Sequence, residues 1–161
     1  MPKSTVRSVI ALDPARGADE AEAATVPARL AEYRRHGARA AAAFVAGASS
    51  PQAPPGRLRT AHIRTVLGTP DHVIAQANAG MYTDPGAVGV RPHSEAYLRR
   101  RPQPALTVWT SEKAAEWERG TLRVPRSRVE YWPRTGHYLP EERMERTVGL
   151  IRTWADGVMA G

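Results

Sequence analysis

The sequence predicts an α/β domain, with a parallel sheet of about three strands, flanking helices and a long helical insertion. Three short runs rich in β-branched or aromatic residues, at 5–12, 105–110 and 128–132, have the length and composition of buried strands. Helical patterns separate these runs, and strands separated by helices pair in parallel through right-handed crossovers. The length of 161 residues fits one such domain.

The first strand is predicted over TVRSVIAL, because its apolar members are mostly β-branched and because Asp13-Pro14 ends the run abruptly. A short continuous apolar run is typical of a strand that neighbouring elements cover on both faces. We therefore expect both faces of this strand to be covered.

The insertion, expected over 15–103, is predicted to be helical. Apolar residues recur at helical spacing over 26–47, and another helix is expected over 57–67. The Ser- and Pro-rich stretch 49–56 between them predicts a loop.

A further helix is predicted to follow Thr69-Pro70-Asp71 and to run toward Met81. The interpretation is that the Thr69 hydroxyl caps the helix and that Pro70 occupies its first turn.

The C-terminal third predicts two helices. A short one begins at Ser111, and the last one opens at Pro140, where proline and two following acids suit the positive end of a helix dipole. The last helix carries apolar residues at the spacing of one buried stripe. These residues are Met144, Val148, Ile151, Trp154 and Val158.

The composition is that of a globular protein, with 42% hydrophobic and 24% charged residues. The absence of cysteine excludes disulfide scaffolds, thiol catalysis and Cys-ligated metal sites. No apolar run approaches the roughly 20 residues of a membrane span, and the first residues lack the features of a secretory signal. We therefore expect no membrane partner and a cytoplasmic location.

The formal net charge is +7, and the cations are 21 arginines and two lysines. The densest cluster, 99–101, is a candidate phosphate-binding feature. However, acids are interspersed among the arginines, and no zinc-finger spacing, RNP-type aromatic stretch or basic region with heptads is present. The expectation is a solvated surface and no nucleic-acid partner.

The stretch 104–154 resembles the closing section of the α/β-hydrolase family. ALTVWT is similar to its penultimate strand, RVEYW to its last strand, and TGHYLPEER to the loop that leads from that strand into the C-terminal helix. VRSVIALDP resembles the strand after the nucleophile helix, and the helical insertion 15–103 resembles the cap. The resemblance covers nearly the whole chain, but only about the latter half of a complete family member.

The resemblance implies that His137 is the catalytic histidine. An imidazole suits this role because its pKa lies near neutrality, so it can accept a proton from a hydroxyl or water and return it. Without the flanking pattern, His137 would be interpreted as a surface residue at a helix start. The remaining histidines are interpreted as surface or cap residues; they are His36, His62, His72 and His93.

Two acids are candidates to orient the histidine, because the family carries this acid after either of two strands. Asp13 follows the first predicted strand and is preferred, while Glu112 follows the second. The competing interpretation of Asp13 is an ordinary Asp-Pro turn.

The family's nucleophile lies on a G-x-S-x-G turn, which the resemblance would place before the first strand. The 161 residues contain no such motif. The nearest approach, around Ser49, ends in proline and follows a helix, so Ser49 is interpreted as a loop serine.

No metal and no cofactor are expected. His36 and His62 have no paired acids at metal-ligand spacing, which argues against a zinc site. The substrate implied by the resemblance is small, apolar and ester-like. Phe44, Met81 and Tyr82 are candidates to line an acyl or alkyl pocket, and ordinary helix packing is the alternative.

An unpaired sheet edge is a further expectation, because the resemblance places other strands before TVRSVIAL. Exposed edges invite pairing with another chain. We therefore expect either self-association or pairing with an N-terminal hydrolase half.

Three functional hypotheses follow. The first is a hydrolase of the ester, epoxide or carbon–halogen class, inactive alone and completed by a nucleophile supplied in trans. The second is a non-catalytic remnant that binds a ligand or partner. The third is a basic protein associated with nucleic acid.

Overall fold

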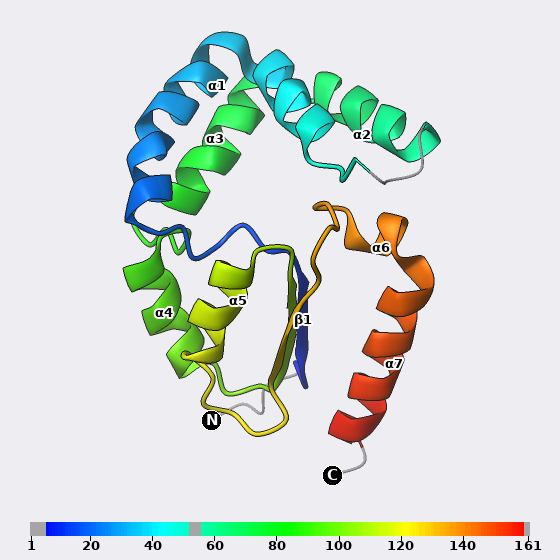
Figure 1. The fold of residues 1–161 in the computed structure, drawn as a ribbon. Helices are drawn as coiled ribbons and strands as arrows, with labels where there is room; N and C mark the ends of the chain where they lie inside the picture. The colour runs from blue at the N-terminus through cyan, green and yellow to red at the C-terminus, as the bar shows by residue number, and fades with distance from the viewer. Residues whose placement is uncertain (1–5, 52–55, 160–161) are drawn as a thin grey trace. The chain divides into compact units, whose positions relative to one another are not determined.

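The structure, a computed structural model, describes residues 6–51 and 56–159 and divides the chain into two compact units (Figure 1). The core unit comprises the segment that ends at Pro14 and the segment that begins at Glu95. The helical unit is Ala15–Ser94, which begins at the first residue of the predicted insertion and ends before residue 103.

The core unit contains one open sheet. Its strands are β1 (Val9–Leu12), β2 (Ala105–Trp109) and β3 (Arg128–Tyr131). The order is β1-β2-β3 and both pairs are parallel, which confirms the predicted fold class. The register aligns Leu12 with Val108, and Val108 with Glu130. The three strands therefore present their carboxyl ends at the same edge of the sheet.

β1 lies at the edge of this sheet, and the prediction that both of its faces are covered is wrong. Ile10 is 38% exposed, and within residues 6–51 and 56–159 only β2 pairs with β1. The central strand is β2, all of whose residues are buried. The apolar run of β1 therefore leaves apolar surface and one row of backbone groups uncovered.

Helix α5 (Glu112–Arg119) connects β2 to β3, as predicted, and covers one side of the sheet (Figure 1). The Ser111 hydroxyl caps it by accepting a hydrogen bond from Ala114 N at 3.3 Å. Helix α4 (Arg91–Arg100) precedes β2 and has no counterpart among the predicted elements.

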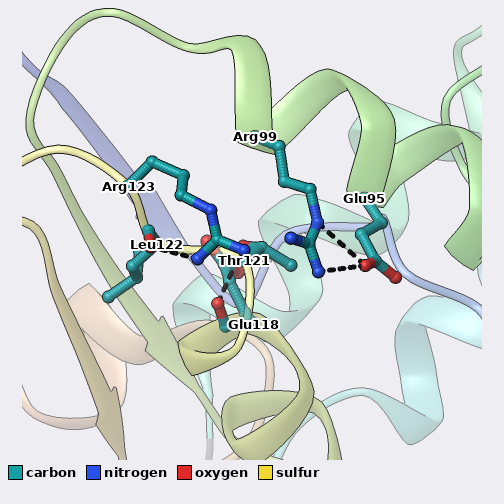
Figure 2. Close-up of polar contacts among 6 residues, drawn as sticks. All are labelled: Glu95, Arg99, Glu118, Thr121, Leu122 and Arg123. Atoms are coloured by element: carbon teal, nitrogen blue, oxygen red, sulfur yellow. Dashed lines mark hydrogen bonds and ion pairs between the residues drawn. The ribbon is translucent and has the colours of Figure 1, made fainter.

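A buried carboxylate joins α5 to the central strand. Glu118 is completely buried, and its two oxygens accept hydrogen bonds from Thr107 Oγ1 and Trp109 Nε1, each at 2.8 Å. Thr121 Oγ1 donates to the Glu118 carbonyl at 2.8 Å, which closes the turn after the helix (Figure 2). These two hydrogen bonds fix the end of α5 against β2.

Arginines close to this turn make local bonds. Arg99 Nε donates to Glu95 Oε1 at 2.9 Å along α4, and Arg123 Nη1 donates to the Leu122 carbonyl at 2.9 Å (Figure 2). Part of the chain's large arginine content is thus engaged within the core unit.

The predicted last helix is divided in two. Its parts are α6 (Leu139–Glu142) and α7 (Met144–Met159), on the side of the sheet away from α5 (Figure 1). Trp154 is buried as expected, but Met144 and Val148 are 64% and 41% exposed, so this part of the predicted stripe is wrong. Arg143 has φ −142° and ψ 51°, and this break gives α7 a register independent of α6. The buried face of α7 consequently passes through Thr147 and Trp154.

The helical unit contains α1 (Glu20–Gly47), α2 (Arg57–Leu67) and α3 (Asp71–Tyr82), and α1 contacts both of the others. α1 begins earlier than predicted because Asp19 and Glu22 form a reciprocal capping box. Within the described part of the chain, no helix has the length and apolar character needed to cross a membrane.

α1 is kinked at Gly37, where φ is 41° and ψ is −118°. The kink frees Ala38 N from the helical pattern, and this group donates to Asp71 Oδ1 at 2.8 Å. A Cβ atom on Gly37 would lie 2.0 Å from the same oxygen. The kink therefore requires glycine, and it joins α1 to the start of α3.

The predicted capping role of Thr69 is wrong. Pro70 occupies the N-cap of α3 without a side-chain cap, and Thr69 Oγ1 donates to the Thr65 carbonyl at 3.0 Å. The connection between α2 and α3 is short, so the Thr69 hydroxyl lies next to the end of α2 and donates its hydrogen bond there instead of capping α3.

Candidate active site

Polar side chains gather where the three parallel strands end. Asp13 follows β1 directly, Thr110 follows β2 directly, and His137 lies in the loop after β3. Functional groups in open α/β sheets concentrate outside the carboxyl ends of the strands. The two residues that the sequence predicted, Asp13 and His137, are brought together here across 124 positions of the chain.

Each oxygen of the Asp13 carboxylate has its own hydrogen-bond partner. Oδ1 accepts hydrogen bonds from Thr110 N at 3.0 Å and from Thr110 Oγ1 at 2.9 Å. Oδ2 lies 2.9 Å from His137 Nδ1. Thr110 therefore holds one oxygen and leaves the other for the imidazole.

The backbone of Asp13 departs from the strand to reach this position. Its N–H still donates to the Val108 carbonyl at 2.7 Å, so strand pairing continues up to the residue itself. Its φ of 45° lies in the left-handed region, which Asp tolerates better than most residues. The residue is thus anchored by its amide and turned by its backbone toward the end of β2.

The histidine loop is fixed at both ends by buried side chains. Trp132 and Leu139 are 1% and 0% exposed, and they pack with Val108, with Leu12 and Leu150 against this cluster. The cluster includes the last residue of β1 and the last but one of β2. The apolar core therefore adjoins the polar site, since Leu12 of the cluster immediately precedes Asp13.

Glu142 ties down the middle of the same loop. It is buried, and its Oε2 accepts a hydrogen bond from Gly136 N at 2.9 Å. Thr147 Oγ1 donates to the Leu139 carbonyl at 3.3 Å. These bonds reach the residues on either side of the His137-Tyr138 pair and restrict how far the imidazole can move.

The pair of Asp13 and His137 shifts both pKa values. The hydrogen bond that His137 donates to Asp13 raises the pKa of His137 above its ordinary 6.5, and it outweighs the opposing effect of burial. Burial alone would raise the pKa of Asp13, but the hydrogen bonds from His137 and Thr110 outweigh burial and lower it below 3.8. The lowered pKa favours the ionised form of the Asp13 carboxylate, and the raised pKa favours the protonated form of the His137 imidazole.

The outer face of the imidazole is open. The side chain of His137 is 41% exposed, against 15% for Asp13. With Nδ1 directed at Asp13, the remaining ring nitrogen, Nε2, has no hydrogen-bond partner among the described residues. The ring also packs edge-on against Tyr138, with centroids 5.3 Å apart. This arrangement presents one basic nitrogen to an incoming molecule.

Among the comparisons with known proteins, only the comparison with solved structures gives a match. No family model matches the chain, and no curated protein sequence matches it significantly. Among solved structures it is similar to a thermophilic esterase from Thermogutta terrifontis, determined with malate bound, at a TM-score of 0.61 and 21% identity. The fold is similar to that of an esterase. The match covers 94% of this chain and 56% of the esterase chain, so this chain spans little more than half of the esterase's length.

The other sequence candidates are not part of the hydrogen-bonded pair of Asp13 and His137. Glu112 is exposed in the first turn of α5, and the hydrogen-bonded acid is Asp13. Ser49 lies just after α1 in the helical unit. His36 lies 3.8 Å from Glu32 on the same helix, and His93 Nδ1 lies 3.1 Å from a backbone carbonyl. Among the residues that the structure describes, no cluster of three potential metal ligands occurs.

Sequence reasoning missed two residues of the site. Thr110 looks like the last residue of a strand, and its pairing with Asp13 spans 97 positions. Glu142 looks like a first-turn acid that interacts with the helix dipole, and it instead binds the histidine loop. A threonine that immediately follows the neighbouring parallel strand is the signal that points to Thr110.

Proposed function

We propose that this chain carries the histidine and the acid of an ester-hydrolase site, with His137 as general base and Asp13 as the acid that orients it. The nucleophile is supplied from outside the 161 residues. The observation that carries the proposal is the 2.9 Å hydrogen bond between Asp13 Oδ2 and His137 Nδ1 at the carboxyl end of the sheet. The similarity in fold to an esterase supports it.

The proposed chemistry assigns one role to each ring nitrogen of His137. Asp13 holds the proton on Nδ1, so Nε2 carries the free electron pair. Nε2 accepts the proton of a hydroxyl nucleophile as its oxygen forms a bond to the ester carbonyl carbon. Nε2 then gives this proton to the alcohol oxygen as the ester bond breaks, and the ionised Asp13 stabilises the transient imidazolium.

The hydrogen bond with Asp13 raises the pKa of His137, which makes the imidazole a stronger base and supports its role as the general base. The proposed substrate is a small, apolar carboxylic ester. Epoxide and carbon–halogen hydrolysis use the same kind of base to activate water, so they are alternatives within the hydrolase class.

The proposed partner is the protein segment that carries the nucleophile and the amides for the developing oxyanion. The edge of β1 that is unpaired among the described residues supports docking there, and so do Ile10, which is 38% exposed in β1, and Val6, which precedes β1 and is 51% exposed. The proposed occupant is an N-terminal hydrolase half. A second copy of this chain is the alternative occupant of the edge, and it would cover β1 without supplying a nucleophile. Light scattering that gives only a 17.6 kDa species at micromolar concentration would argue against the second copy.

The test combines sequence and activity. The coding region that precedes Met1 is searched for a strand–G-x-S-x-G–helix segment, and the polypeptide that carries it is co-expressed with this chain. We expect turnover of 4-nitrophenyl acetate by the pair, little by this chain alone, and a loss of about 10³-fold or more with His137→Ala. His72→Ala, which alters an exposed histidine on α3, is the control.

Two outcomes would contradict the proposal. Equal ester turnover by the wild-type pair and by His137→Ala would remove His137 from the reaction. Failure of the co-expressed segment to associate with this chain would favour the non-catalytic binding hypothesis.

A further inference from the structure

The helical unit contains a pocket of about 300 Å³ that is lined by α1, α3 and Ala15. Ligand pockets typically measure about 300–1,000 Å³, and a cavity of about 150 Å³ is enough to hold benzene. All the lining residues belong to the helical unit. The pocket therefore has room for a molecule with one aromatic ring and a short chain.

The walls of the pocket are mostly apolar. Phe44 and Tyr33 come from α1, and Ile74 and Met81 come from α3. Phe44 is 60% exposed, which is unusual for so large an apolar side chain and leaves its ring open to contact. A ligand with an apolar tail would cover this surface and gain its burial energy.

One cation lines the same pocket. The guanidinium carbon of Arg29 lies 4.8 Å from the centroid of the Tyr82 ring, and Arg29 Nε is buried without a hydrogen-bond partner. No carboxylate of the described residues forms an ion pair with Arg29. The stacked ring orients the guanidinium but leaves its charge uncompensated, and a partly buried charge without a partner is costly.

An amide belongs to the lining of the same pocket. Asn78 Oδ1 is buried and has no hydrogen-bond partner. Since the two ends of an Asn amide exchange by rotation about one bond, the group can offer either a donor or an acceptor to a ligand. The Tyr82 hydroxyl is already used, because it donates to the Ala15 carbonyl at 3.4 Å. Arg29 and Asn78 are thus the two lining residues that each have a buried polar side-chain atom without a hydrogen-bond partner.

We propose that this pocket binds a small amphipathic carboxylate. The carboxylate pairs with Arg29 and accepts a hydrogen bond from the Asn78 amide, and the apolar tail packs between Phe44, Ile74 and Met81. The geometry favours a carboxylate because a neutral ligand would leave the guanidinium unpaired. A phosphate monoester, with up to two charges, would find only one cation in the lining.

The proposal stands apart from the ester-hydrolase site, because none of the residues that it uses belongs to the core unit. Binding is therefore expected to be the same in His137→Ala as in the wild-type chain. Loss of binding in the pocket variants and loss of hydrolysis in His137→Ala are separate results, so the two proposals fail independently.

The test is isothermal titration calorimetry of the full chain with 4-phenylbutyrate. Two further compounds are titrated in the same way. 4-Phenyl-1-butanol has a matched shape without the charge, and inorganic phosphate is the alternative anion. We expect saturable binding of the acid with 1:1 stoichiometry. We also expect at least about tenfold weaker binding of the alcohol, since hydrogen bonds to charged groups contribute most of the specificity. Inorganic phosphate should give no saturable heat.

Two variants assign the binding to this pocket. Arg29→Gln should weaken 4-phenylbutyrate binding at least about tenfold, whereas Arg34→Gln, an exposed arginine of the same helix, should change it by less than about twofold. Ala77→Phe adds a ring at an exposed position of the lining and should abolish binding without disturbing the core. Circular dichroism confirms that each variant is folded.

The proposal is overturned if 4-phenylbutyrate gives no saturable heat up to 10 mM (about 2.7 kcal/mol of binding free energy). Equal affinities for the acid and the alcohol would show that Arg29 does not select the ligand. Unchanged affinity in the folded Ala77→Phe variant would place the binding elsewhere on the chain.

Discussion

Thr110 donates two hydrogen bonds to one oxygen of Asp13, from its amide at 3.0 Å and from its hydroxyl at 2.9 Å. This relationship determines what the candidate site can do, because it occupies Oδ1 and leaves Oδ2 for His137. It also joins the ends of β1 and β2, so the acid is held by the neighbouring strand rather than by its own loop. The orientation of the imidazole thus follows from the pairing of two strands.

Asp13→Asn should lower the pKa of His137, because the hydrogen bond that this carboxylate accepts is the largest cause of the raised value. The titration of the His137 ring is followed by two-dimensional NMR of the labelled imidazole. In the co-expressed assembly, the same substitution should reduce ester turnover by about 10⁴-fold, since an amide favours the wrong tautomer.

The control for this prediction is Glu112→Gln, which alters the other acid that the sequence offered. Glu112 is exposed in the first turn of α5, so its substitution should leave the His137 titration in place. A fall in the His137 pKa with Glu112→Gln and none with Asp13→Asn would reverse the assignment of the acid.

The stability of the chain should depend on pH through the same pair. The raised pKa of His137 contributes stability below about pH 6.5 that is lost as the pH rises through the folded-state value. The lowered pKa of Asp13 contributes stability above about pH 3.8 that is lost as the pH falls through its folded-state value. The stability gained from the pair should therefore be largest between these two pH values.

Urea denaturation of wild-type chain and His137→Ala at several pH values measures this effect. The difference in unfolding free energy should be greatest near pH 5 and should shrink toward pH 9 and toward pH 2. A difference that stays constant across this range would show that the ion pair makes no contribution in solution.

Glu142→Ala should loosen the histidine loop, because it removes the acceptor of Gly136 N. We expect a loss of stability of about 1.5–3 kcal/mol and faster hydrogen exchange at Gly136, by about tenfold or more. Glu142→Gln keeps an oxygen acceptor and should restore most of the protection. Glu145→Ala, at an exposed position in the first turn of α7, is the control and should leave the Gly136 amide unchanged.

The sequence predicted the strands because they depend on local signals, and it predicted the pair of Asp13 and His137 because the resemblance to a hydrolase family implies a histidine and an acid after strand ends. Apolar runs locate the strands, and parallel strands bring their carboxyl ends to one edge, so residues that follow different strands must meet there. The resemblance to a hydrolase family then pointed to His137 within its loop.

The parts that the sequence did not predict depend on contacts between distant residues. The bond between Ala38 N and Asp71 spans 33 positions, and nothing near Gly37 signals a kink in an otherwise helical pattern. The exposure of Met144 and Val148 depends on the break at Arg143, which shifts the register of α7. A helical spacing shows which residues share a face, but the packing decides which face is buried.

Gly37→Ala should destabilise the helical unit. The substitution places a Cβ at a φ of 41° and within 2.0 Å of Asp71 Oδ1, so Asp71 must move and give up its bond to Ala38 N. The left-handed backbone costs about 1–2 kcal/mol, and the lost hydrogen bond adds about 1.5–3 kcal/mol. Gly47→Ala, at an exposed position at the end of the same helix with no atom within 4 Å of the added Cβ, should be neutral or stabilising by up to about 1 kcal/mol. Thermal unfolding followed by circular dichroism at 222 nm measures both variants. If Gly37→Ala were as stable as Gly47→Ala, α1 would be a straight helix in solution, and its hydrogen bond to the start of α3 would be absent.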